Sequence, residues 1–281
     1  MTRILTGAVG VLILIPACFL SHTVLWPILL SIFGVIAVLE MIGCIGLKEK
    51  KAFVWPSVIF AVLPMLSWIL SIKLGTDPFR VIFWFTALYV FSQQVISILT
   101  GIRLHTEKLY SLIALVIYVV ISLTAISLIR YIDEGNQEGK HIYLLVFLGG
   151  WISDTFAYFT GRAFGKHKLC PEISPKKTVE GSIGGIVANM IAFAGYAFIL
   201  RQYFEVGANV VFFAILGALF SVVGQFGDLF ASAIKRQFGI KDYGKLFPGH
   251  GGVLDRFDST LAIASVMYLV YAAFGISFLI R

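Results

Sequence analysis

The sequence predicts an all-α, polytopic integral membrane protein with about nine transmembrane helices. Apolar residues make up 59% of the chain and charged residues only 13%, whereas soluble domains carry about 45–50% and about 25%. The mean hydropathy is +0.92. Apolar runs of about 20 residues, the length that crosses the hydrocarbon core of a bilayer, follow one another along the chain.

The predicted spans follow from these apolar runs. They lie near residues 4–20, 24–47, 53–72, 79–100, 109–129, 142–161, 181–200, 208–230 and 260–280. The first span follows Arg3 directly, as the apolar part of a signal peptide would. A second long span begins almost at once, so we expect a retained helical hairpin rather than cleavage.

The chain divides by polarity into two predicted regions. Residues 1–140 form N-terminal transmembrane helices, which we interpret as a scaffold that could carry oligomer contacts. Residues 141–281 form a catalytic transmembrane region with the polar loops. Glu40 lies within an apolar run of the first region, close to Lys48, and a structural partner or a snorkelling side chain is favoured over a catalytic role there.

Lysine and arginine predict the orientation of the chain. With nine spans, 16 of the 22 cationic side chains fall on the side of the N-terminus. Cytoplasmic loops carry such an excess, so we expect the polar loops in the cytoplasm and the C-terminus outside. The cations border apolar spans, which favours a bilayer and phosphate-bearing substrates over nucleic acid. The three scattered cysteines argue against a disulfide framework and a zinc site.

The most polar stretch of the second region is residues 224–259. A helix over 224–238 would place four polar side chains on one face: Asp228, Ser232, Lys235 and Arg236. Three more share a face at i, i+3 and i+4: Asp255, Asp258 and Ser259. Between them, Gly249, Gly251 and Gly252 allow left-handed backbone and close approach of N–H groups to an anion.

Carboxylates, glycines and cations in this combination suit metal-assisted phosphoryl chemistry, because carboxylate oxygens hold Mg²⁺ while lysine and arginine neutralise phosphate. A solvated loop of mixed charge between two helices is the plainer interpretation. Asp228 favours function, because a carboxylate within an apolar span costs about 2.5–3.5 kcal/mol on insertion scales.

A second polar cluster lies around the sixth span. Asp154, Tyr158 and Arg162 recur every four residues and so share a helix face. Further on, Ser174-Pro175-Lys176-Lys177-Thr178 precedes a predicted helix with Thr178 as its N-cap. The N-terminus of a helix can bind phosphate, because its free N–H groups and its positive dipole end favour an anion. The lysines alone would serve equally well as membrane anchors, and the segment does not match a P-loop.

These segments resemble the phosphatidate cytidylyltransferases, also called CDP-diglyceride synthases. The resemblance is carried by three runs of the sequence: Ser232-x-x-Lys235-Arg236 with Lys241-Asp242 and Pro248-Gly249-His250-Gly251-Gly252-x-x-Asp255-Arg256-x-Asp258; Ser174-Pro175-Lys176-Lys177-Thr178-x-Glu180-Gly181; and Asp154-x-x-Ala157-Tyr158-x-x-Gly161-Arg162. It covers about residues 150–260, whereas the N-terminal region is similar only in its repeated apolar spans.

The resemblance implies a multi-pass enzyme of the inner (plasma) membrane that joins CTP and phosphatidic acid into CDP-diacylglycerol and pyrophosphate, for phospholipid biosynthesis. Mg²⁺ would be held by Asp228 and Asp255, with Asp154 and Asp258 assisting; one ion, two divalent ions, and a divalent with a monovalent ion all remain open. Catalytic roles fall to Asp228, Asp255, Lys235, Arg236 and Asp258. Substrate binding falls to Ser174, Lys176, Lys177, Thr178, Ser232, Lys241, Asp242, Gly249, His250, Gly251, Gly252 and Arg256. A monomer and a homodimer both remain open.

Two other functions fit part of the pattern. A CTP-dependent lipid kinase of the polyprenol or dolichol type would transfer the γ-phosphoryl group and release CDP. A transporter of anionic metabolites would use Asp154 and Asp228 as coupling sites, although the two halves show none of the matching interrupted helices typical of repeat transporters. The Asp-Gly-x-x-Ala-Arg opening of the CDP-alcohol phosphotransferases is absent from the sequence.

Overall fold

The fold is almost wholly helical. The computed structural model describes residues 16, 18–100, 106–132, 139–247, 249 and 251–275. Within those residues, eight helical spans are long and apolar enough to cross a membrane, close to the nine predicted, so the chain is a multi-pass membrane protein. The predicted first span, near 4–20, lies almost entirely outside the described residues.

The chain forms two compact units. The first comprises Met1–Tyr131 and Gln237–Phe257, and the second Ile132–Arg236 and Asp258–Arg281. The division therefore differs from the boundary at residue 140, because the polar loop after residue 237 belongs with the N-terminal helices. Whether the two predicted regions divide the function as expected stays a prediction.

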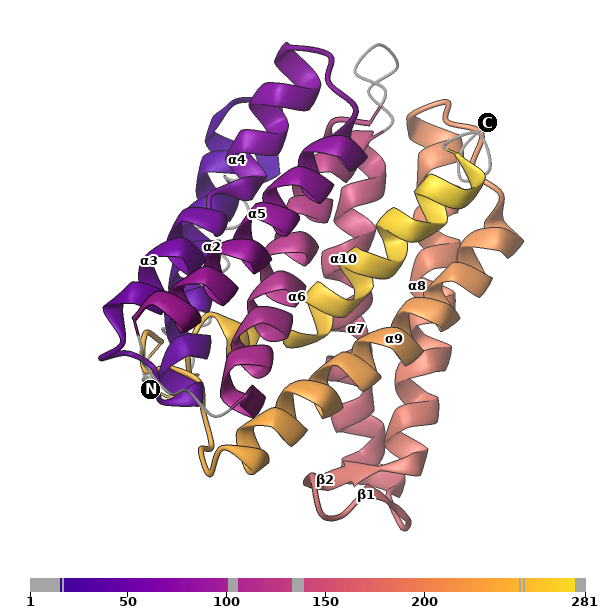
Figure 1. Cartoon of the computed structure of the whole chain (residues 1–281). Coiled ribbons are helices and arrows are strands. Elements are labelled where there is room, and N and C mark those ends of the chain that lie inside the picture. Colours follow the sequence, from indigo (N-terminus) through magenta and orange to yellow (C-terminus); the bar gives the residue numbers. More distant parts are fainter. Residues whose placement is uncertain are drawn as a thin grey trace. The chain divides into compact units, whose positions relative to one another are not determined.

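The first unit is a helical bundle (Figure 1). Its elements are α2 (Leu25–Ile45), α3 (Lys51–Phe60), α4 (Leu63–Ser67), the π-helical turn η1 (Trp68–Lys73), α5 (Pro78–Leu99) and α6 (Thr106–Arg130). α6 packs against α2 and α4, and α3 packs against α5. α6 is the most buried of the eight spans, and its side chains supply much of this unit's core.

The predicted span 53–72 is a single crossing built from three pieces, α3, α4 and η1. Pro64 lies in the first turn of α4, where its missing N–H leaves no helical hydrogen bond unmade. Buried polar side chains join this span to α5: Gln93 Nε2 donates to Phe53 O at 3.1 Å and to Ser57 Oγ at 3.0 Å. Gln93 is thus a structural residue of the bundle.

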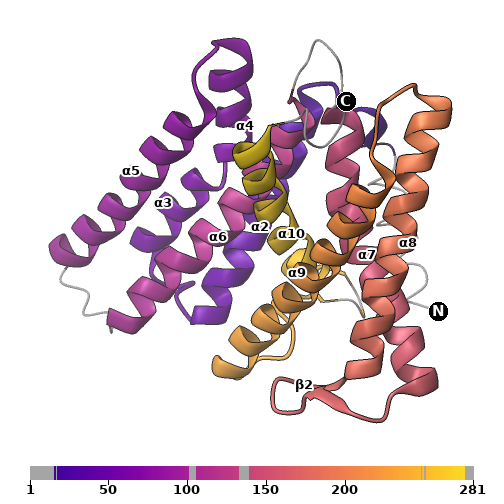
Figure 2. The same ribbon diagram turned by 90° about the vertical axis from the view of Figure 1, so that its right-hand side faces the viewer.

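The second unit contains a close pair of helices and a small hairpin. Its elements are α7 (Gly139–Phe164), β1 (Lys168–Cys170), β2 (Ser174–Thr178), α8 (Val179–Tyr203), α9 (Val210–Gln237) and α10 (Leu254–Phe274), of which α9 leaves the unit after Arg236 and α10 enters it at Asp258. α7 and α8 pack through glycine: a Cβ on Gly181 would lie 2.6 Å from Ala157 O. Figures 1 and 2 show the hairpin at one end of this pair.

The hairpin was not predicted. β1 and β2 are antiparallel, with Lys168 opposite Thr178 and Cys170 opposite Ser174. Strands this short show no alternation that distinguishes them from a loop. The expected N-cap is confirmed, because Thr178 Oγ1 accepts a hydrogen bond from Gly181 N at 3.2 Å at the start of α8. The hairpin thus fixes the two lysines immediately before a helix N-terminus.

Candidate active site

An ion pair between Lys177 and Asp228 forms the centre of the candidate site in the second unit. Lys177 Nζ lies 2.6 Å from Asp228 Oδ2, and both side chains are about three-quarters buried, with exposures of 24% and 25%. Ser232 Oγ donates to Asp228 Oδ1 at 3.3 Å, so these two residues of the predicted polar face of α9 lie together. β2 and α9, which are far apart in the sequence, therefore meet through this pair.

Two further aspartates, Asp258 and Asp154, lie near the Lys177–Asp228 ion pair. The half-buried carboxylate of Asp258, on α10, interacts electrostatically with Asp228 and Asp154 and with the ammonium of Lys235. Asp154, on α7, accepts a hydrogen bond from Ser259 Oγ at 3.3 Å. Three carboxyl groups from three helices are thus gathered with two lysines.

We call Asp154, Asp228 and Asp258 with Lys177 and Lys235 the aspartate cluster. Lys235 is only 8% exposed, which is rare for a lysine and requires the neighbouring carboxylates to offset its desolvation. Asp154 is more exposed than its place within a predicted span suggests. All five residues were predicted from the sequence as candidates, and the structure places them together.

A buried polar network holds the helices that carry this cluster. Gln225, one turn before Asp228, accepts a hydrogen bond from Ser182 Oγ and donates to Ser182 O at 3.2 Å. It also donates to Ser221 Oγ at 3.1 Å, and Ser221 Oγ pairs with Ser153 Oγ at 2.7 Å. α7, α8 and α9 are therefore tied together one turn from the ion pair. Gln225 was not predicted from the sequence, although a glutamine within an apolar span indicates a buried hydrogen-bonding role.

A different group of carboxylates lies in the first unit. Asp255 is 8% exposed, and its Oδ2 accepts backbone hydrogen bonds from Tyr243 N at 2.8 Å and Gly252 N at 2.9 Å. Glu40, on α2, accepts from Val253 N at 3.0 Å and Leu254 N at 2.9 Å. These two carboxylates bind the loop of residues 243–252 and the start of α10, and the expected role of Asp255 as a metal ligand stays a prediction.

Glycine suits the positions 249, 251 and 252 of this loop for different structural reasons. Gly249 and Gly251 adopt positive φ angles of 79° and 82°, which favour glycine. For Gly252, the three atoms nearest to an added Cβ are the carboxylate atoms of Glu40, so the absent side chain makes room for that carboxylate. Close approach to a nucleotide, the role predicted for all three, remains a prediction.

The other predicted site residues have fewer contacts in the structure. Most of the cations lie exposed, together with one aspartate: Lys176, Arg236, Lys241, Asp242 and Arg256. Ser174 is half-buried in β2, and His250 lies outside the described residues. Across the ranges that the structure describes, no group of three or more His, Cys, Asp or Glu side chains has the spacing of a metal site. The exposed cations face solvent, where a charged ligand can reach them.

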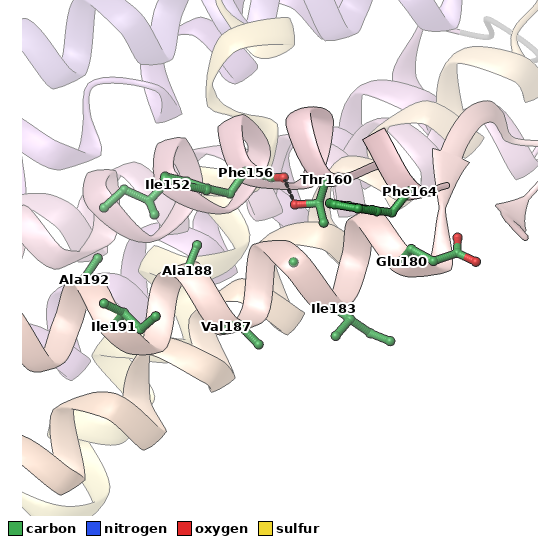
Figure 3. Close-up of a pocket in the computed structure, with 11 residues that line it drawn as sticks. Ile152, Phe156, Thr160, Phe164, Glu180, Ile183, Val187, Ala188, Ile191 and Ala192 are labelled. Carbon is green, nitrogen blue, oxygen red and sulfur yellow. Dashed lines mark hydrogen bonds between the residues drawn. The ribbon is translucent and has the colours of Figure 1, made fainter. Parts of the chain in front are cut away.

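A groove of about 710 Å³ lies between α7 and α8 of the second unit (Figure 3). Figure 3 shows Ile152, Phe156 and Phe164 of α7 across from Ile183 and Val187 of α8. Its only charged lining residue is Glu180, a carboxylate that would repel phosphate. The groove therefore suits apolar groups.

Comparisons with known proteins identify the family of the chain. Curated proteins named phosphatidate cytidylyltransferase match the chain: one from Staphylococcus saprophyticus is 41% identical over 140 residues, covering 50% of this chain and 52% of that protein. One from Staphylococcus aureus strain COL is 43% identical over 139 residues, covering 49% and 51%. The aligned part of the chain thus spans about half the length of these relatives. The cytidylyltransferase family matches residues 1–274, and the chain therefore belongs to this family.

Proposed function

We propose that this protein transfers the cytidylyl group of CTP to phosphatidic acid, forming CDP-diacylglycerol and pyrophosphate. The observation that carries the proposal is the Lys177–Asp228 ion pair beside Asp258 and Asp154. The aspartate cluster brings together one residue from each of the three runs that resemble phosphatidate cytidylyltransferases, Asp154, Lys177 and Asp258, in a chain of the cytidylyltransferase family. The names of the relatives support this choice of lipid substrate.

The reaction needs positioning and charge screening more than proton removal. A phosphate oxygen of phosphatidic acid is already anionic and attacks the α-phosphorus of CTP, forming a new P–O bond. The bond between the α-phosphorus and the bridging oxygen to the β-phosphate breaks, and pyrophosphate leaves with that electron pair. Phosphate oxygens would be held by exposed cations, whose charge a solvated ligand can reach: Lys176, Arg236, Lys241 and Arg256.

The aspartate cluster suits a divalent cation by its donor chemistry. Hard carboxylate oxygens are the ligands that Mg²⁺ prefers, and Asp228, Asp258 and Asp154 concentrate them. A bound Mg²⁺ would neutralise phosphate oxygens and the departing pyrophosphate. Lys177 neutralises Asp228 in the structure. We infer that metal binding at Asp228 would release Lys177, whose ammonium could then bind a phosphate.

The proposal places the polar loops in the cytoplasm, the compartment that holds CTP, in agreement with the excess of lysine and arginine on that side. The lipid substrate would stay in the bilayer with its headgroup reaching the aspartate cluster. Lys235 lies in the last turn of α9 and Asp258 in the second turn of α10, whereas Asp154 and Asp228 lie more than two turns inside α7 and α9. The headgroup would enter from the membrane boundary, past Lys235 and Asp258.

Product analysis of the purified protein in detergent micelles tests the proposal. The sample receives phosphatidic acid, Mg²⁺ and CTP labelled at the α-phosphate. We expect the label in the lipid fraction and one pyrophosphate released for each labelled lipid. Release of CDP without labelled lipid would favour the lipid kinase and overturn the proposal. No turnover of nucleotide by a folded sample would also overturn it, and flux of anionic metabolites across sealed vesicles would then indicate a transporter.

A further inference from the structure

A glutamate of α2 reaches a loop that lies near the other end of the sequence. Glu40 is 9% exposed within the first unit, and each of its two carboxylate oxygens accepts a hydrogen bond from a different backbone N–H group. Oε1 accepts a hydrogen bond from Val253 N at 3.0 Å, and Oε2 accepts one from Leu254 N at 2.9 Å. Leu254 is the first residue of α10, so the carboxylate satisfies donors at a helix N-terminus, where negative charge is favourable.

The loop is shaped around this carboxylate. A Cβ added at Gly244 or Gly252 would meet Glu40 Oε1 before any other heavy atom outside its chain neighbours. A side chain at either position would therefore displace the Glu40 carboxylate from its present place. The contact is specific in shape as well as in charge, because glycines on either side of the loop leave the space that the carboxylate fills.

A second carboxylate completes the support of the same loop. Asp255 Oδ2 accepts from Tyr243 N and Gly252 N. Four backbone N–H groups between residues 243 and 254 thus donate to just two side chains, one of which belongs to the distant helix α2. Glu40 and Asp255 are close enough for their charges to repel, and Lys48 attracts Glu40. Two buried like charges are retained here at a cost that apolar packing would avoid.

We propose that Glu40 is a positioning residue for the proposed cytidylyl transfer, holding residues 243–254 in the conformation that CTP requires. The proposal rests on the proposed function, since this segment carries glycines predicted to approach the nucleotide and adjoins Lys241 and Arg256. Glu40 touches no substrate in this scheme. It acts through the backbone of Val253 and Leu254, whose N–H groups would otherwise need other acceptors.

Amide exchange, read by mass spectrometry on the full-length protein in detergent, tests the structural half of the proposal. We expect Glu40→Ala to speed exchange in peptides spanning 243–254 by at least about tenfold. Glu40→Gln keeps the shape and one acceptor oxygen, so its exchange should be intermediate. Glu49→Gln is the matched control, because Glu49 is an exposed carboxylate just after α2. In this variant, exchange in the peptides spanning 243–254 should equal that of the unmodified protein.

Kinetics test the functional half. We expect kcat/KM for CTP to fall by at least about tenfold in Glu40→Ala and less in Glu40→Gln, because a loosened loop binds nucleotide poorly. KM for phosphatidic acid should change less than KM for CTP. A variant that is merely destabilised would keep kcat and both KM values when they are calculated per folded molecule. Gln93→Leu supplies that reference, since Gln93 is a buried polar residue of the same unit that binds only the bundle.

A double variant tests whether Gly252 and Glu40 act through the same contact. Gly252→Ala places a methyl group against the Glu40 carboxylate and should speed exchange by itself. In the Glu40→Ala background that methyl group meets no carboxylate, so its additional effect should be much smaller than in the unmodified protein. If Glu40→Ala does not fold, exchange in Glu40→Gln, which loses the charge and keeps the shape, decides the positioning role instead.

The outcomes separate the two proposals. Unchanged exchange in Glu40→Ala would overturn the positioning role, and so would faster exchange with unchanged kcat/KM for CTP. If the unmodified protein transfers no cytidylyl group, the proposed function fails, and the catalytic role of Glu40 fails with it. The exchange measurement would still decide whether Glu40 holds the loop.

Discussion

The two groups of buried carboxylates differ in the partners that satisfy them. In the second unit, Asp228 meets the ammonium of Lys177 and the charges of neighbouring aspartates, and side chains supply most of the interactions. In the first unit, Glu40 and Asp255 accept hydrogen bonds from four backbone N–H groups. One group is thus satisfied mainly by side chains, with Ser259 N as a main-chain donor to Asp258, and the other mainly by the main chain.

This difference indicates what each group can do. A carboxylate bound to backbone N–H groups fixes the shape of the chain and exchanges its partners only when the loop opens. A carboxylate neutralised by a lysine side chain can exchange that lysine for a metal or yield it to a phosphate by rotation of a few side-chain bonds. The aspartate cluster is therefore the better candidate for chemistry, and the Glu40 and Asp255 contacts are better suited to support.

The largest expected effect is that of Asp228→Asn. Loss of its charge removes the partner of Lys177 and a carboxylate that the proposal gives to Mg²⁺, so turnover of CTP should fall by at least about a hundredfold. Turnover per folded molecule, with folding checked by thermal melting, measures this. Glu172→Gln, at an exposed carboxylate of the hairpin turn, should keep turnover within about twofold. Normal turnover in Asp228→Asn would remove the cluster from the mechanism.

A smaller effect is expected from Lys177→Met, which keeps the length of the side chain without its charge. Turnover should fall by about tenfold, because a phosphate loses one cation. Binding of Mn²⁺, measured by calorimetry in the absence of nucleotide, should tighten by about three- to tenfold, since no ammonium competes for Asp228. Lys176→Met, at the exposed neighbour, should leave Mn²⁺ affinity unchanged. Weaker Mn²⁺ binding in Lys177→Met would contradict the proposed exchange.

The smallest effect concerns the cap that follows the hairpin. Thr178→Ala removes the oxygen that accepts from Gly181 N and should lower the free energy of unfolding by about 1 kcal/mol. Thr178→Ser keeps the acceptor and should be nearly neutral. Thermal melting of the purified protein distinguishes the two variants. Equal melting temperatures for Thr178→Ala and the unmodified protein would show that the cap contributes little.

Local patterns predicted much of the fold. Apolar runs located the helices, and the four-residue spacing of Asp228 and Ser232 correctly placed both on one face of α9. The N-cap at Thr178 followed from a polar residue before an apolar run. Such features depend on neighbours within one or two turns, which a sequence shows directly.

Contacts between distant segments could not be predicted in this way. Lys176 and Lys177 are equivalent in the sequence, and only the register of β2 selects Lys177 as the partner of Asp228. Glu40 was expected to have a structural partner or to snorkel; it has structural partners, Val253 and Leu254, but they lie near the other end of the sequence, where no local pattern points to them. The short hairpin was missed because its strands carry no periodic pattern.

The central claim is that the aspartate cluster serves chemistry whereas Glu40 and Asp255 hold the loop. Amide exchange of peptides spanning 243–252, compared between Asp228→Asn and Asp255→Asn in parallel with turnover, tests it most directly. We expect both variants to lose turnover, with faster exchange in Asp255→Asn alone, because Tyr243 N and Gly252 N lose a charged acceptor. Equal exchange in the two variants would contradict the claim.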